Sequence, residues 1–186
     1  MSYDFNLFQP KAGLDVDSAA EQWIAEEEAL VLAGTGPIDP VKEEQKRRLS
    51  TALINCNPGL SPFAFEYDKL AELEGITEEE ARVRHRHIEL NGAIDGNGIQ
   101  IMLFDDSASI TVPHRHTAEQ SKVVFGEVWQ YLHILEKEGG FRTFDPQLGR
   151  VLELSKDFDE VVSVYGRSLE GVGGIVGKHK QPKWKF

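Results

Sequence analysis

Residues 98–146 read GIQIMLFDDSASITVPHRHTAEQSKVVFGEVWQYLHILEKEGGFRTFDP. Apolar residues recur at every second position through 99–104, which is the period of a β-strand. Asp105-Asp106-Ser107 is a turn signal, and β-branched residues return over 109–112. The stretch therefore begins with a predicted β-hairpin.

A helix follows the hairpin. Thr117 and Gln120 have the spacing of a capping box, and Gly139-Gly140 marks the end. Residues 141–144 then predict a short strand that stops at Asp145-Pro146. The helix has a broad apolar face at 3.6-residue spacing, made of Val124, Phe125, Val128, Trp129, Tyr131, Leu132 and Leu135.

The pattern on either side of this unit supplies the remaining elements. We expect strands at 3–8, 88–90 and 150–154, and helices at 18–33, from Asp39-Pro40 to about 56, after the capping box of Thr77 and Glu80, and from Asp157. Phe63, Phe65 and Tyr67 are expected to pack on the core. Gly171, Gly173, Gly174 and Gly177 are expected to loosen the chain.

Taken in order, these elements predict an α+β fold. Without residues 37–90, the order is β-α-β-β-α-β, the ferredoxin-like pattern. We expect a two-layer sandwich, with residues 37–90 as a helical insertion and an extra strand and helix at the C-terminal end. The alternative is an antiparallel sheet with an unrelated strand order. Residues 1–176 are expected to form one domain, and 177–186 a basic, flexible tail.

Charge is distributed unevenly along the chain. The net charge is −11, and residues 1–80 hold 17 acidic and 6 basic residues, whereas residues 81–186 hold 14 of each. An acidic front half argues against nucleic acid as a ligand, because phosphates require cations. It is compatible with a basic protein partner. The alternative is that the acidic helices are simply solvated.

The composition also bears on location. No apolar run reaches the roughly 18 residues of a membrane-spanning helix, and no signal peptide is visible at the start of the sequence. The single cysteine, Cys56, excludes an internal disulfide and is interpreted as a small buried residue. We expect a cytoplasmic protein that binds no membrane.

Two His-x-His pairs are the candidate metal ligands. His85 and His87 form one pair, and His114 and His116 form the other. On neighbouring strands the four imidazoles would offer a nitrogen set suited to zinc. Against this, arginines surround the first pair, and Pro113 precedes the second. The alternative is a set of titratable histidines at a polar sheet edge, with no cofactor.

The sequence resembles a group of small, uncharacterised bacterial proteins. The shared features are Ser2-Tyr3-Asp4-Phe5 at the start, the 99–113 hairpin, the turn Asp145-Pro146-Gln147 and the ending Trp184-Lys185-Phe186. The resemblance implies no catalytic residue. Small acidic cytosolic proteins of this kind include immunity partners of secreted toxins, which is an analogy of size, charge and setting.

The leading functional hypothesis is therefore a non-enzymatic protein-binding module, an immunity-type inhibitor that binds a basic toxin domain. Its binding surface is expected on an acidic helical face that includes Glu26, Glu27, Glu28, Glu43 and Glu44. One alternative is a small metal-dependent enzyme that uses the paired histidines. A second is a homodimeric domain that binds a small ligand.

Overall fold

A computed structural model describes residues 2–11, 13–30, 38–93 and 96–176, with the backbone alone for 26–30, 118 and 168–176. The structure is an α+β fold, 49% helical and 20% strand. The expected tail, 177–186, lies outside the described residues. The elements are β1 (Ser2–Phe8), α1 (Val16–Leu30), α2 (Pro40–Cys56), β2 (Ser61–Pro62), α3 (Tyr67–Glu74), α4 (Glu78–Arg84), β3 (Ile88–Asn91), β4 (Gln100–Leu103), β5 (Ser107–Pro113), α5 (Ala118–Gly139), β6 (Arg142–Asp145), β7 (Arg150–Val151) and α6 (Phe158–Val176).

One antiparallel sheet organises the described part of the chain. It has seven strands in the order β2-β3-β4-β5-β1-β6-β7. The predicted hairpin is confirmed as β4 and β5, which pair with Ile101 opposite Ile110. β1 lies between β5 and β6, with Phe5 opposite Ile110 and Leu7 opposite Thr143. Residues near the start of the sequence thus pair with residues 142–144.

Pro62 lies in the edge strand β2. The neighbouring Phe63 N–H points inward and donates to the carbonyl of Glu89 at 2.8 Å, so Pro62 occupies the alternate, outward position. Proline has no N–H to offer an added strand, and it is tolerated in sheets at such edges. This edge is therefore poorly suited to pairing with another chain.

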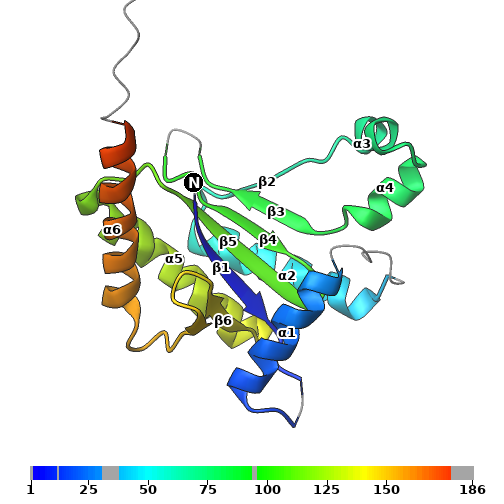
Figure 1. Ribbon diagram of the computed structural model, residues 1–186. Helices are drawn as coiled ribbons and strands as arrows, with labels where there is room; N and C mark the ends of the chain where they lie inside the picture. Colours follow the sequence, from blue (N-terminus) through cyan, green and yellow to red (C-terminus); the bar gives the residue numbers. More distant parts are fainter. Residues whose placement is uncertain (1, 12, 31–37, 94–95, 177–186) are drawn as a thin grey trace, which may run out of the picture.

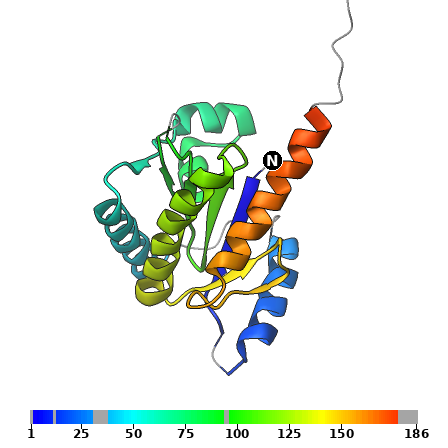
Figure 2. The same ribbon diagram turned by 90° about the vertical axis from the view of Figure 1, so that its left-hand side faces the viewer.

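The two faces of the sheet carry different helices. Tyr3, Phe5 and Leu7 of β1 point into the main core, where α2, α5 and α6 bury their apolar sides. Phe8 points to the other face of the sheet. Unlike the preceding residues on that face it is buried, because it packs with Ala19, Ala20 and Trp23 of α1. Its ring stacks on Trp23 at 5.6 Å. Figures 1 and 2 show α2 and α5 behind the sheet and α1 in front of it.

Helix starts were predictable because capping is local. Asp39 accepts a hydrogen bond from the Val41 N–H at the start of α2, and the capping boxes of Thr77 and Thr117 are both present. Gly140 ends α5 in the left-handed conformation, with φ 72°. These predictions are confirmed.

Three local predictions were wrong. β7 ends at Val151, because Leu152 and Leu154 turn into the core and the Leu154 carbonyl accepts from the Trp129 indole. α6 continues through the glycines to Val176, since glycine lowers helix propensity without breaking the helical backbone. Cys56 is exposed rather than buried, because it lies at the C-terminal end of α2.

The helices α3 and α4 form a projection that we call the arm, residues 66–84. The two helices pack against each other. Figure 1 shows the pair standing away from the sheet, beyond the ends of β2 and β3. A helical segment of this kind exposes most of its side chains.

Among the described helices, none combines the length and the apolarity that a membrane span requires.

Candidate functional site

The predicted acidic face draws its residues from two helices, α1 and α2. Glu26, Glu27 and Glu28 belong to α1, where the structure describes only the backbone. Glu43 is half-buried and bonds to Lys46 at 2.7 Å. Apart from the buried Lys46, α2 carries three basic and two acidic residues, so its surface has charges of both signs.

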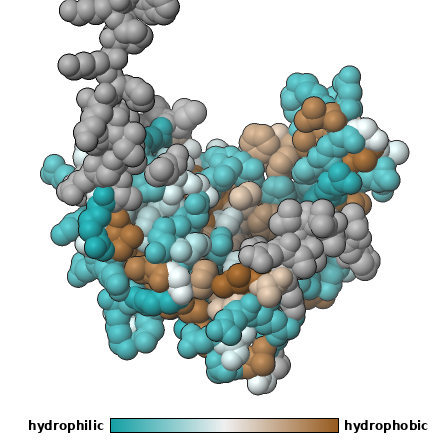
Figure 3. All heavy atoms as spheres, viewed as in Figure 1, coloured by the Kyte–Doolittle hydropathy of each residue, from teal (hydrophilic) through white to brown (hydrophobic). Residues whose placement is uncertain are grey.

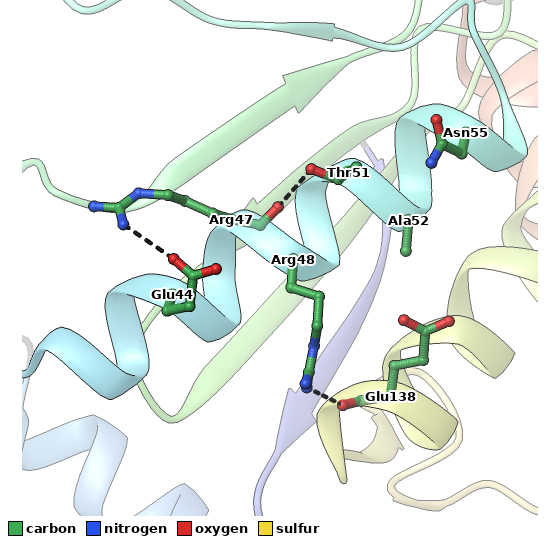
Figure 4. A pocket seen from close by; sticks show the side chains of 7 residues that line it. All are labelled: Glu44, Arg47, Arg48, Thr51, Ala52, Asn55 and Glu138. Carbon is green, nitrogen blue, oxygen red and sulfur yellow. Dashed lines mark hydrogen bonds and ion pairs between the residues drawn. The ribbon is translucent and has the colours of Figure 1, made fainter.

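Glu44 lies in a shallow groove between α2 and the end of α5 (Figure 4). The groove has a volume of about 400 Å³. Glu44 pairs with Arg47 at 3.3 Å, and Arg48 donates to the Glu138 carbonyl at 2.9 Å. Charges of both signs line the groove, which offers no acidic surface. Its lining residues are Glu44, Arg47, Arg48, Thr51, Ala52, Asn55 and Glu138.

Lys46 is the centre of a buried ion cluster that the sequence did not predict. Its ammonium group lies 2.9 Å from the Asp105 carboxylate and 3.1 Å from the Arg86 carbonyl. Arg86 donates to the other Asp105 oxygen at 2.6 Å. Burial opposes the charge on Asp105, but the hydrogen bonds from Arg86 and Lys46 hold its pKa below its usual range. The cluster fastens α2 to the residues that flank β3 and β4.

The two histidine pairs have separate surroundings. His85 and His87 lie at the base of the arm, with their ring centres 6.4 Å apart. His114 stacks on Tyr165 of α6 at 4.9 Å. His116 is buried, and burial lowers its pKa. Among the residues whose positions are described, no three His, Cys, Asp or Glu side chains are grouped so as to hold a metal ion.

The arm carries an acidic surface. Its residues, 66–84, hold seven acidic side chains against three basic ones, Lys69, Arg82 and Arg84. Leu73 stands among them with 83% of its surface exposed. Figure 3 shows a mostly hydrophilic arm with apolar patches.

Aromatic rings join the arm to the sheet. Phe65 contacts Phe63 at 5.0 Å, Tyr67 at 5.9 Å and His87 at 4.9 Å. His87 in turn stacks on Phe104, which follows β4, at 5.1 Å. Phe63 is 50% exposed and Phe104 is 37% exposed. The prediction that Phe63, Phe65 and Tyr67 pack on the core was wrong, because these rings pack on one another and on histidines.

The sheet face beside the arm is polar. Glu89 accepts hydrogen bonds from the side-chain amides of Asn91 and Gln100 at 2.7 and 2.9 Å. The cross-strand registers place a set of residues without lysine or arginine on this face of β1, β3, β4 and β5: Asp4, Asn6, Glu89, Asn91, Gln100, Met102, Ser109 and Thr111.

No protein-family model, curated protein or solved structure matches the chain.

Proposed function

We propose that this protein is a non-enzymatic protein-binding module, and that it binds a basic partner through the arm. An immunity-type inhibitor of a bacterial toxin is the form of this function that the charge and size favour. We also propose a cytoplasmic location, which agrees with a single cysteine.

The observation that carries the proposal is the surface of the arm. Among the described residues, Asp68, Glu72 and Glu79 are exposed and form no ion pair. Their charges are therefore available to a partner, and an acidic surface speeds the encounter with a basic one. Leu73 and the half-exposed Phe63 add apolar contact area, which charged surfaces need for lasting association.

The proposal moves the binding surface from α2 to the arm. α1 stays a candidate flank, since its sequence holds five acidic residues and no lysine or arginine. The polar sheet face beside the arm supplies hydrogen-bond acceptors, including the carboxylates of Asp4 and Glu89. A partner on the arm can therefore extend onto this face of β1, β3, β4 and β5, where the residues named above include no lysine or arginine.

The test is affinity capture at pH 7.5 from cells of the native source, with quantitative mass spectrometry. The natural chain is expected to retain a basic protein in stoichiometric amount and to release it as the salt concentration rises. Neutralising the arm should reduce capture at least tenfold. The arm variant combines Asp68→Asn, Glu72→Gln and Glu79→Gln.

The control has the same change of charge elsewhere. Glu119, Glu138 and Asp159 are exposed residues of α5 and α6, and the control combines Glu119→Gln, Glu138→Gln and Asp159→Asn. It should capture the partner like the natural chain. Equal loss in both variants, or no stoichiometric partner, would contradict the proposal.

The ferredoxin-like pattern expected from the sequence is also kept as a proposal. The antiparallel order β4-β5-β1-β6 supports it, as do α2 and α5 on one face. In this reading α2, from the expected insertion, takes the position of the first crossover helix. α1, β2, β3 and β7 are then additions to the pattern.

A further inference from the structure

His87 occupies the junction between the arm and the sheet. Its ring stacks on Phe104, at an interplanar angle of 30°, and meets the edge of Phe65 at 73°. Phe104 directly follows β4, whereas Phe65 directly precedes the arm. His87 therefore contacts both sides of the junction, and any change in its charge acts on the contact between them.

The surroundings of His87 favour a neutral ring. The charged and titratable groups that face it are Glu89 of β3, Lys46 of α2 and His85 after α4. Burial lowers the pKa of His87, Glu89 raises it, and His85 and Lys46 lower it further, with a net effect downward. Aromatic rings on both sides replace the water that an imidazolium needs.

His85 is placed differently, although it is only two residues away. One of its ring nitrogens lies 2.6 Å from the Glu74 carboxylate, and Arg84 binds the other Glu74 oxygen at 2.6 Å. These contacts lie inside the arm or at its end. Arg84 and His85 thus link the end of α4 to α3 through Glu74, whereas a proton on His87 opposes the link between the arm and the sheet.

We propose that protonation of His87 loosens the junction between the arm and the sheet, so that the junction is closed at neutral pH (the docked arm) and open in mild acid (the detached arm). The proposal rests on the proposed function in one respect: if the arm is the binding surface, acid weakens partner binding. The docking equilibrium itself belongs to the free protein.

The direction follows from proton linkage. In the detached arm, His87 is exposed and titrates near the ordinary value of about 6.5. In the docked arm it binds its proton only at a lower pH. Docking is therefore fully favourable above about pH 6.5 and weakens as the pH falls below it, by up to about tenfold per pH unit, until the docked ring also titrates.

The experiment measures amide hydrogen exchange of the partner-free protein by NMR between pH 7.5 and 5.0. The Phe63 amide reports on the junction, because it donates to the Glu89 carbonyl at 2.8 Å. The Ile110 amide in the middle of the sheet is the reference. The Phe63 protection factor should fall by up to about tenfold per pH unit below 6.5, while that of Ile110 stays constant.

Three variants complete the test. His87→Phe keeps a ring and removes the titration, so the Phe63 protection factor should become independent of pH. His87→Gln gives the same comparison if the first variant does not fold. His133→Gln, at an exposed site on α5, should keep the natural response.

The proposal fails if the natural protein shows a constant Phe63 protection factor, or if the response survives in the neutral His87 variants. It also fails if the His87 ring titrates at or above 6.5. None of these results depends on a partner, and the capture experiment at pH 7.5 does not depend on His87. The two proposals therefore fail separately.

Discussion

At the scale of single residues, Lys46 is buried by tertiary contacts although its neighbours in the sequence predict an exposed side chain. Its side chain is 2% exposed, yet the sequence of α2 places it among charged residues. A buried ammonium group is tolerated when carboxylates and carbonyls surround it. Here Glu43, Asp105 and the Arg86 carbonyl do so.

Replacing Lys46 should therefore be costly. Lys46→Met removes the cation and leaves Glu43 and Asp105 with Arg86 alone, which we expect to lower the free energy of unfolding by about 3 kcal/mol. Urea denaturation followed by circular dichroism measures this. Lys42 is a matched control, because its pair with Asp106 is at the surface. Lys42→Met should cost less than about 1 kcal/mol, and equal costs would contradict the buried cluster.

The same cluster shows why some contacts of the site could not be predicted from the sequence. Lys46, Arg86 and Asp105 are separated by 19 to 59 positions where they bond, and no local spacing links them. The ring contact of His87 with Phe104 has the same origin, because it depends on how β3 pairs with β4. The carboxylate of Asp145 is the contrasting case: it accepts from the Gln147 and Leu148 N–H groups, which an Asp at the start of a turn commonly does because its side chain reaches the amides that follow it.

At the scale of elements, one of the two capping boxes starts a helix of the core and the other starts a helix of the arm. Thr117 starts α5, which contributes Phe125, Val128 and Leu132 to the core. Thr77 starts α4, which packs on α3 in the arm. Local sequence predicts both caps equally well. Only the fold tells which helix supports the whole protein.

This difference gives a paired prediction. Thr117→Ala should lower the global free energy of unfolding by about 1 kcal/mol, since an N-cap contributes about that much. Thr77→Ala should reduce hydrogen-exchange protection of the α4 amides by a similar free energy and leave the global denaturation curve unchanged. If Thr77→Ala lowers global stability as much as Thr117→Ala, the arm unfolds together with the core.

Elements were easier to predict than the faces they cover. The periods of β1 and α5 are plain in the sequence, and both were predicted close to their observed bounds. That α1 covers the opposite face follows from one extra apolar residue, Phe8, and its contact with Trp23. A single residue at the end of a strand is too little for sequence to assign a helix to a face.

At the scale of the whole molecule, the arm and β1 contribute unequally to the packing of the core. The arm projects from one end of the sheet, whereas β1 pairs on both sides and places Tyr3, Phe5 and Leu7 in the core. Stability should therefore depend strongly on β1 and weakly on the arm.

Two deletions test this contrast. Removal of residues 2–8 should abolish the cooperative thermal transition, because β5 and β6 lose their shared neighbour. Replacement of residues 66–84 by a short Gly-Ser linker should leave a cooperative transition. Calorimetry measures both. A folded protein without β1, or an unfolded one without the arm, would contradict the architecture.

The position of β1 also sets the order in which a growing chain can fold. Asp4 pairs with Thr111 and Asn6 with Phe144, so a ribosome must add roughly a hundred residues before β1 meets its first neighbour, and about thirty more before the second. Such long-range pairing slows folding. Until then, the apolar side chains of β1 are exposed and can bind chaperones of nascent chains. A tag or fusion placed before Ser2 is therefore attached to the strand that stays unpaired longest during synthesis.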